Sequence, residues 1–60
     1  MEFEINSNVI KSFIVDSDAL QVTIDYTDGR VRTVDVEEQM LNRFAESEDK
    51  EKFYSERWAP

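Results

Sequence analysis

Four carboxylates crowd into six residues near the end of the chain, at Glu46, Glu48, Asp49 and Glu51. Facing carboxylates can do acid–base chemistry when a cleft holds them together, and on an open surface they bind cationic side chains. Triad-type nucleophilic catalysis is excluded, because the chain has no His and no Cys. A chain of 60 residues also has little room for a catalytic cleft. We therefore predict that the protein is not an enzyme and that these acids form a binding surface.

Residues for a metal or cofactor site are missing. Asp16 and Asp18 are spaced as in part of a calcium loop, but the central Gly and the distal Glu of that loop are absent. No Gly-rich phosphate cradle occurs, since Gly29 is the only glycine. We expect neither a metal ion nor a cofactor.

The charge balance favours a basic protein as the partner. Fourteen acidic residues against seven basic ones give a net charge of -7. Such a field repels nucleic acid and anionic membrane and attracts basic protein surfaces. The alternative is that the acids only keep a small domain dissolved. Among the bases, Arg30 and Arg32 share one strand face, where we expect their heads to pair with Asp28 or with a helix acid.

Alternating and β-branched stretches indicate strands. Residues 8–16 are rich in Val, Ile and Phe, and residues 20–26 alternate apolar and polar side chains. Residues 1–5 also alternate, so they either add a short edge strand or fray. The sequence thus predicts strands over most of its first half.

The sequence TDGR indicates a tight hairpin, because Asp-Gly tolerates the positive φ that such turns require. A three-residue loop ending at the glycine places Val22 opposite Val34. It also sets Thr23 opposite Thr33 on the exposed face. A two-residue loop would instead place Val22 opposite Asp35. We prefer the three-residue loop, because it keeps apolar residues together.

The period changes to that of a helix after the hairpin. Asp35 and Glu38 have the spacing of a capping box at a helix start. Ser47 is the expected N-cap of a second helix, in which Glu48 can reach Lys52. The apolar positions are Met40, Leu41, Phe44 and Ala45 in the first helix and Phe53, Tyr54 and Trp58 in the second.

These elements predict an α+β fold in a single domain over residues 1–60. We expect a three-stranded antiparallel sheet, with a short extra N-terminal strand as an option, followed by two C-terminal helices packed on one face. No secretory signal and no apolar stretch of membrane-spanning length occurs, which predicts a cytoplasmic protein, in the host cell if a phage encodes it. The expected state is a monomer, or a weak homodimer through the edge of the first strand.

The order strand, strand, Asp-Gly hairpin, strand, helix, helix resembles the KTSC domain over nearly the whole chain. SNVIKS at residues 7–12 is similar to the opening strand of that family, LQVTIDYTDGRV to its central hairpin and AESEDKEKFYS to its passage between helices. The central Tyr-x-Tyr pattern of the family falls here on Arg32 and Val34. The resemblance implies the same fold and, as an alternative function, an accessory domain that binds RNA or DNA through Arg30, Arg32 and neighbouring strand residues.

The acids together indicate a docking face for a basic partner. Duplex DNA carries one negative charge per about 1.7 Å of axis, and carboxylates along a helix edge can imitate part of that array. We therefore predict an anti-CRISPR-like inhibitor from a phage or mobile element, which mimics nucleic acid and binds a basic surface of a nucleic-acid-binding protein. All the acids share one end of the molecule if the helices fold back on one another. The expected partner-binding residues are Asp35, Glu37, Glu38, Glu46, Glu48, Asp49 and Glu51, with Tyr54 and Trp58 as aromatic anchors.

Overall fold

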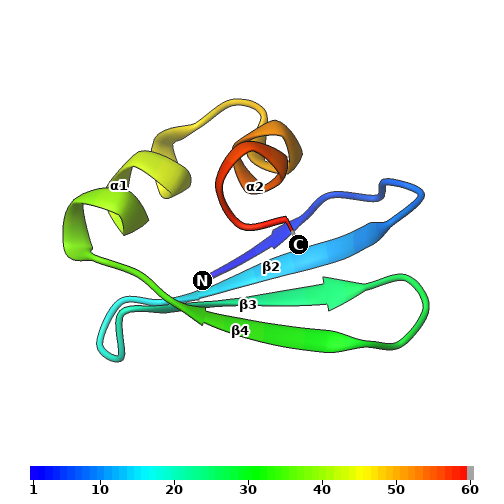
Figure 1. Cartoon of the computed structure of the whole chain (residues 1–60), viewed down its shortest axis with the longest axis horizontal. Coiled ribbons are helices and arrows are strands. Elements are labelled where there is room, and N and C mark those ends of the chain that lie inside the picture. The colour runs from blue at the N-terminus through cyan, green and yellow to red at the C-terminus, as the bar shows by residue number, and fades with distance from the viewer. Residues whose placement is uncertain (60) are drawn as a thin grey trace.

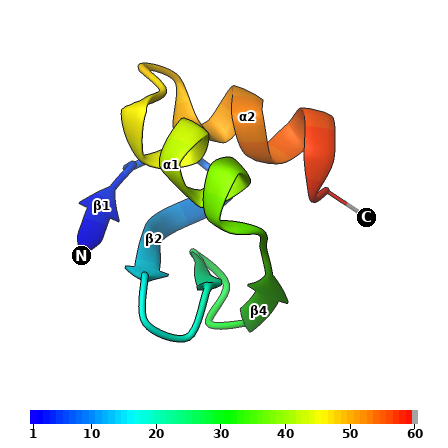
Figure 2. The same ribbon diagram turned by 90° about the vertical axis from the view of Figure 1, so that its left-hand side faces the viewer.

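Four antiparallel strands followed by two helices build the chain (Figure 1). The computed structural model describes residues 1–59. The strands lie side by side in sequence order, and both helices lie on the same side of the sheet (Figure 2). The α+β fold is therefore confirmed, and the N-terminal stretch forms the extra edge strand. The elements are β1 (Glu2–Glu4), β2 (Ile10–Asp16), β3 (Gln21–Tyr26), β4 (Val31–Asp35), α1 (Glu38–Glu46) and α2 (Lys50–Arg57).

Strand β2 faces the core in spite of two polar residues in its middle. Ile10, Phe13 and Val15 are buried, although the first two are three residues apart. A β-bulge between Ile10 and Ser12 shifts the alternation by one residue. The bulge leaves Lys11 exposed and returns Phe13 to the core side.

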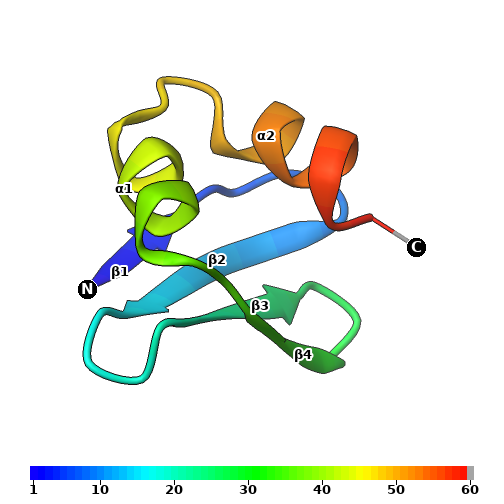
Figure 3. The same cartoon turned by 60° about the vertical axis from the view of Figure 1, so that its left-hand side comes forward.

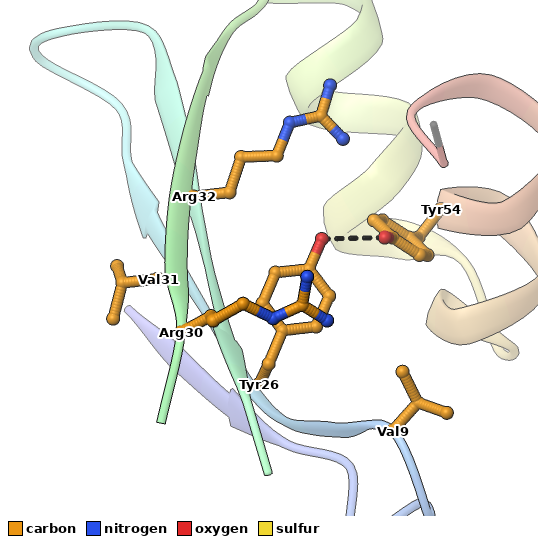
Figure 4. Close-up of a pocket in the computed structure, with 6 residues that line it drawn as sticks. All are labelled: Val9, Tyr26, Arg30, Val31, Arg32 and Tyr54. Atoms are coloured by element: carbon orange, nitrogen blue, oxygen red, sulfur yellow. Dashed lines mark hydrogen bonds between the residues drawn. The ribbon is translucent and has the colours of Figure 1, made fainter. Parts of the chain in front are cut away.

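The β3–β4 hairpin has the predicted register. Val22 pairs with Val34, and Thr23 pairs with Thr33 with their hydroxyl oxygens 3.2 Å apart. Gly29 has a φ of 92°, which lies in the left-handed region that favours glycine. Because the hairpin keeps this register, the side chains of Arg30 and Arg32 emerge on the same side of β4 as the helices (Figure 4).

The start of α1 differs from the predicted capping box. Its N-cap is Glu37, which makes no side-chain capping hydrogen bond. Asp35 instead ends β4, where its carboxylate accepts a hydrogen bond of 3.0 Å from the amide of Gln21. The capping-box prediction is wrong because the sheet holds Asp35 in an extended conformation opposite Gln21.

The start of α2 also differs from the prediction. Its N-cap is Asp49, whose carboxylate accepts a hydrogen bond of 3.0 Å from the backbone N–H of Lys52. Ser47 lies at the end of α1, and its hydroxyl donates to the carbonyl oxygen of Phe44. Within residues 1–59, neither helix has the length and apolar character needed to cross a membrane.

Both helices cover one face of the sheet (Figure 3). The core between them includes the ring of Phe44. Phe44 is fully buried, and its ring centroid lies 5.0 Å from the ring of Phe13 on β2. On the helical side, the ring of Trp58 is also 5.0 Å away and the ring of Phe53 is 5.4 Å away. Such aromatic pairs each add about 0.5–1.5 kcal/mol beyond the burial of their area. Phe44 therefore joins the sheet to both helices.

Candidate functional site

The seven predicted acids form two groups at opposite ends of α1. Asp35, Glu37 and Glu38 lie where β4 passes into this helix, and Glu46 ends it (Figure 1). Glu48 and Asp49 follow in the connection to α2, and Glu51 lies in the first turn of α2. The nine residues of α1, with Glu38 at one end and Glu46 at the other, span about 12 Å at a rise of 1.5 Å per residue. The expectation of a single acidic end does not hold, because α1 itself runs between the two groups.

The second group of acids gains a member from β1. Glu4 lies beside the α1–α2 connection and helps to line an open depression of about 480 Å³. Glu4 is not among the residues predicted from the sequence, because no local pattern brings the first strand next to residues more than forty positions later. We call the four acids of this depression the acidic rim. The depression is lined by Glu4, Ile5, Glu48, Asp49, Lys50 and Glu51.

Lys50, the base that lines this depression, contacts an aromatic ring and a carbonyl oxygen rather than the acids. Its ammonium group lies 4.2 Å from the centroid of the Phe3 ring and donates a hydrogen bond of 2.8 Å to the carbonyl oxygen of Ser47. Within residues 1–59, no acid of the rim forms a salt bridge, and the predicted pair of Glu48 and Lys52 does not form. The negative charge of the rim is therefore not neutralised by contacts within the described chain.

The two predicted aromatic anchors pack into or against the core. Tyr54 is buried, with 7% of its surface exposed. Trp58 is half-buried, and its ring packs against Phe44 and Phe53. An incoming partner can therefore reach part of Trp58 but little of Tyr54.

A second region, which we call the basic cleft, lies between β4 and α2 (Figure 4). It is an open cleft of about 400 Å³ on the helical side of the sheet. Both arginines point into it, whereas the side chain of Val31 points to the other side of β4 (Figure 4). No acid lines this cleft in the described part of the chain. The lining residues are Val9, Tyr26, Arg30, Val31, Arg32 and Tyr54.

Two buried tyrosines meet at the floor of the basic cleft. The hydroxyl oxygens of Tyr26 and Tyr54 are 2.6 Å apart and share one hydrogen bond. Burial raises the pKa of Tyr54 above its ordinary value, and the hydrogen bond with Tyr26 raises it further, while the charge of Arg32 opposes the rise. Tyr54 therefore keeps its proton at neutral pH and remains a hydrogen-bond donor.

Each arginine of the basic cleft makes contacts with other residues of the described chain. Arg30 donates from Nε to Asp28 at 2.8 Å, as predicted, and its guanidinium group lies 5.1 Å from the centroid of the Tyr26 ring. The hydrogen bond from the backbone N–H of Arg30 lowers the pKa of Asp28, and pairing with the Arg30 side chain lowers it further. Arg32 donates to the carbonyl oxygen of Trp58 rather than to a helix acid. A guanidinium group carries five N–H donors, so each arginine has donors beyond the hydrogen bond described for it.

The two regions offer opposite binding chemistry. The acidic rim can bind cations, and the basic cleft can bind anions. Within residues 1–59, no group of acids is close enough together to hold a metal ion. Comparisons with protein-family models and with curated proteins find no match for this chain. The function is therefore inferred from the geometry and charge of these two regions.

Proposed function

We propose that the protein is a non-enzymatic interaction module whose acidic rim binds a basic surface of a nucleic-acid-binding protein. The observation that carries this proposal is the unneutralised charge of the rim: its acids have no salt-bridge partner within residues 1–59. Lys50 is engaged elsewhere, so a partner does not have to displace an internal ion pair before it binds. Charges placed in this way act mainly on the rate and the specificity of association.

The rim is suited to imitating a short piece of nucleic-acid backbone. Glu48, Asp49 and Glu51 lie close together at the start of α2, and Glu4 adds a fourth charge from a different element. A basic groove that neutralises phosphates can accept carboxylates in their place, with the same release of counterions. The biological role that we propose is inhibition of the partner, in the manner of an anti-CRISPR-like protein of a phage or mobile element.

The test begins with capture of partners from host lysate at low salt, followed by elution with duplex DNA. For a partner that DNA elutes, its affinity is then measured for the wild type and for the double variant Glu48→Gln, Glu51→Gln. We expect affinity to fall about tenfold or more and the wild-type affinity to fall steeply with salt.

A matched control removes the same two charges elsewhere. Asp18 and Glu56 are exposed and lie outside the rim, so Asp18→Asn, Glu56→Gln should leave the affinity nearly unchanged. If the two double variants bind equally well, position on the rim is irrelevant and the proposal fails.

A second candidate function is favoured by the basic cleft. An accessory domain of the KTSC type would contact RNA or DNA through Arg30 and Arg32, and both side chains line one cleft. Retention of an RNA or DNA oligonucleotide on a filter at low salt separates the two functions. The net charge of -7 opposes such retention, so an oligonucleotide that is retained must be bound by the basic cleft.

A further inference from the structure

We propose that the basic cleft binds a small phosphate ester of about the size of a mononucleotide. This inference is independent of the acidic rim, which lies at the connection between the helices and takes ligands of the opposite charge. It is also distinct from binding along a nucleic-acid strand, because it assigns a bounded site for one phosphate and its attached group.

The first support is the arrangement of donors around one space. Arg30 directly precedes β4 and Arg32 lies in it, on either side of Val31, and both guanidinium groups reach over the helical side of the sheet (Figure 4). The tyrosine hydroxyls approach the same space from β3 and α2. Two kinds of donor, guanidinium groups and hydroxyls, approach from different elements and suit an anion with several terminal oxygens. A phosphate monoester presents three such oxygens, whereas a carboxylate presents two.

The second support is a hydroxyl hydrogen that the contact between the two tyrosines does not use. Tyr26 and Tyr54 are each more than nine-tenths buried and bring two O–H groups to one short contact. Only one of the two hydrogens can lie in that contact, so the other is left for an acceptor in the open cleft that both tyrosines line. A phosphate oxygen in the cleft can accept it.

The third support is that the charged groups are held in place before any ligand arrives. Asp28 holds Arg30 over the Tyr26 ring, and the carbonyl oxygen of Trp58 holds Arg32 beside Tyr54. Side chains that are already ordered lose less conformational entropy on binding. The pairing with Asp28 offsets part of the charge of Arg30, which leaves Arg32 as the stronger electrostatic partner.

The size of the cleft and its apolar wall indicate what the phosphate carries. A volume of about 400 Å³ is within the usual range for sites of small organic ligands. The exposed side chain of Val9 offers an apolar surface next to the donors. A planar or apolar group esterified to the phosphate can pack there, as a nucleobase or another ring would.

The test is a titration of the ¹⁵N-labelled full chain with adenosine monophosphate, in which the backbone amide chemical shifts are monitored by NMR. Parallel titrations use inorganic phosphate, adenosine, benzoate and a single-stranded oligonucleotide. We expect saturable shifts at residues 26, 30, 32 and 54 with the monophosphate, weaker binding of inorganic phosphate, and no saturation with adenosine or benzoate at about 10 mM. Binding of the oligonucleotide with none of the monophosphate would overturn the proposal and favour the second candidate function instead.

Variants test the donors against a matched arginine. Arg32→Gln should weaken binding of the monophosphate about tenfold or more, because a charge-assisted hydrogen bond is lost. The control is Arg57→Gln: Arg57 also lies over an aromatic ring, 4.3 Å from the centroid of Phe53, but outside the cleft. Tyr26→Phe removes one hydroxyl and should weaken binding without displacing the arginines. Equal affinity of the Arg32 and Arg57 variants, or saturation by adenosine alone, would contradict a phosphate site.

Discussion

The acidic rim and the basic cleft differ in how their charged side chains are held. The rim gathers carboxylates with no internal salt bridge in the described chain, and the base among them is turned toward an aromatic ring. The cleft has only two bases, yet each is fixed by an internal contact and lies beside a buried pair of hydroxyls. The rim thus has more charged groups, and the charged groups of the cleft make more contacts with the rest of the chain.

This difference matters because charge and order support different kinds of binding. Exposed, unpaired charges steer a large partner at long range and are weakened by salt. Ordered donors around a small volume give directional recognition of a small ligand, with less entropy lost on binding. The excess of negative charge therefore indicates only the acidic rim. The fewer positive charges include the two arginines of the basic cleft, whose side chains make contacts within the chain.

The largest effect is expected when the residue that supports both regions is truncated. Phe44 packs against Trp58, which holds Arg32, and lies 5.9 Å from the ammonium group of Lys50 beside the rim. Phe44→Ala should cost about 3–5 kcal/mol of the free energy of unfolding, through lost burial and a cavity. A 60-residue domain has only about 3–9 kcal/mol in total, so most of the variant should be unfolded or nearly so. Urea unfolding followed by far-UV circular dichroism measures this.

The control for that variant is Val31→Ala, an apolar truncation on β4 at a residue that is 63% exposed. Its cost should stay below about 1 kcal/mol. If both variants are equally stable, Phe44 does not support the two regions as described.

A smaller effect is expected inside the basic cleft alone. Tyr54→Phe leaves the buried hydroxyl of Tyr26 without its partner and should cost about 1–2 kcal/mol at neutral pH. The raised pKa of Tyr54 also predicts a pH dependence. Above the ordinary pKa of 10.0, the unfolded chain gives up this proton before the folded chain does, so stability is present below that pH and is lost as pH rises through the folded pKa. Urea titrations at about pH 8 and pH 11 should show a smaller loss in Tyr54→Phe than in the wild type.

Tyr26→Phe and the double variant complete this experiment as a double-mutant cycle. The double variant should be more stable than the sum of the single effects predicts, because neither hydroxyl is then left alone. Strict additivity, or an equal loss of stability at high pH in all four proteins, would contradict a coupled pair.

The smallest effect concerns the rim, where one acid differs from the others. Asp49 caps α2 through its hydrogen bond to the N–H of Lys52, whereas Glu48 makes no such contact in the described chain. Asp49→Ala should therefore cost about 1 kcal/mol, as measured by thermal unfolding. Asp49→Asn keeps the acceptor and should cost little, as should Glu48→Gln. If Asp49→Asn lowers the stability as much as Asp49→Ala does, the helix requires the negative charge of Asp49 rather than its capping hydrogen bond.

The features that could be predicted from the sequence are those fixed by neighbours along the chain. The alternation around Val22 and the Asp-Gly turn were sufficient for the hairpin register, because a one-residue slip would move every apolar side chain to the wrong face. The apolar spacing that includes Leu41 and Phe44 was sufficient for the buried stripe of α1. The caps were missed because several residues near each helix start were suitable, and the sheet, which holds Asp35 in β4, decided between them.

By itself, the sequence determined the order of strands and helices, the register of the hairpin and the excess of negative charge, since each depends on local periodicity or on composition. Only the tertiary structure added Glu4 to the rim and joined Tyr26 to Tyr54, 28 residues away. The physical reason is that these contacts depend on how α2 and β1 pack across the common core around Phe44. No spacing along the chain encodes that packing.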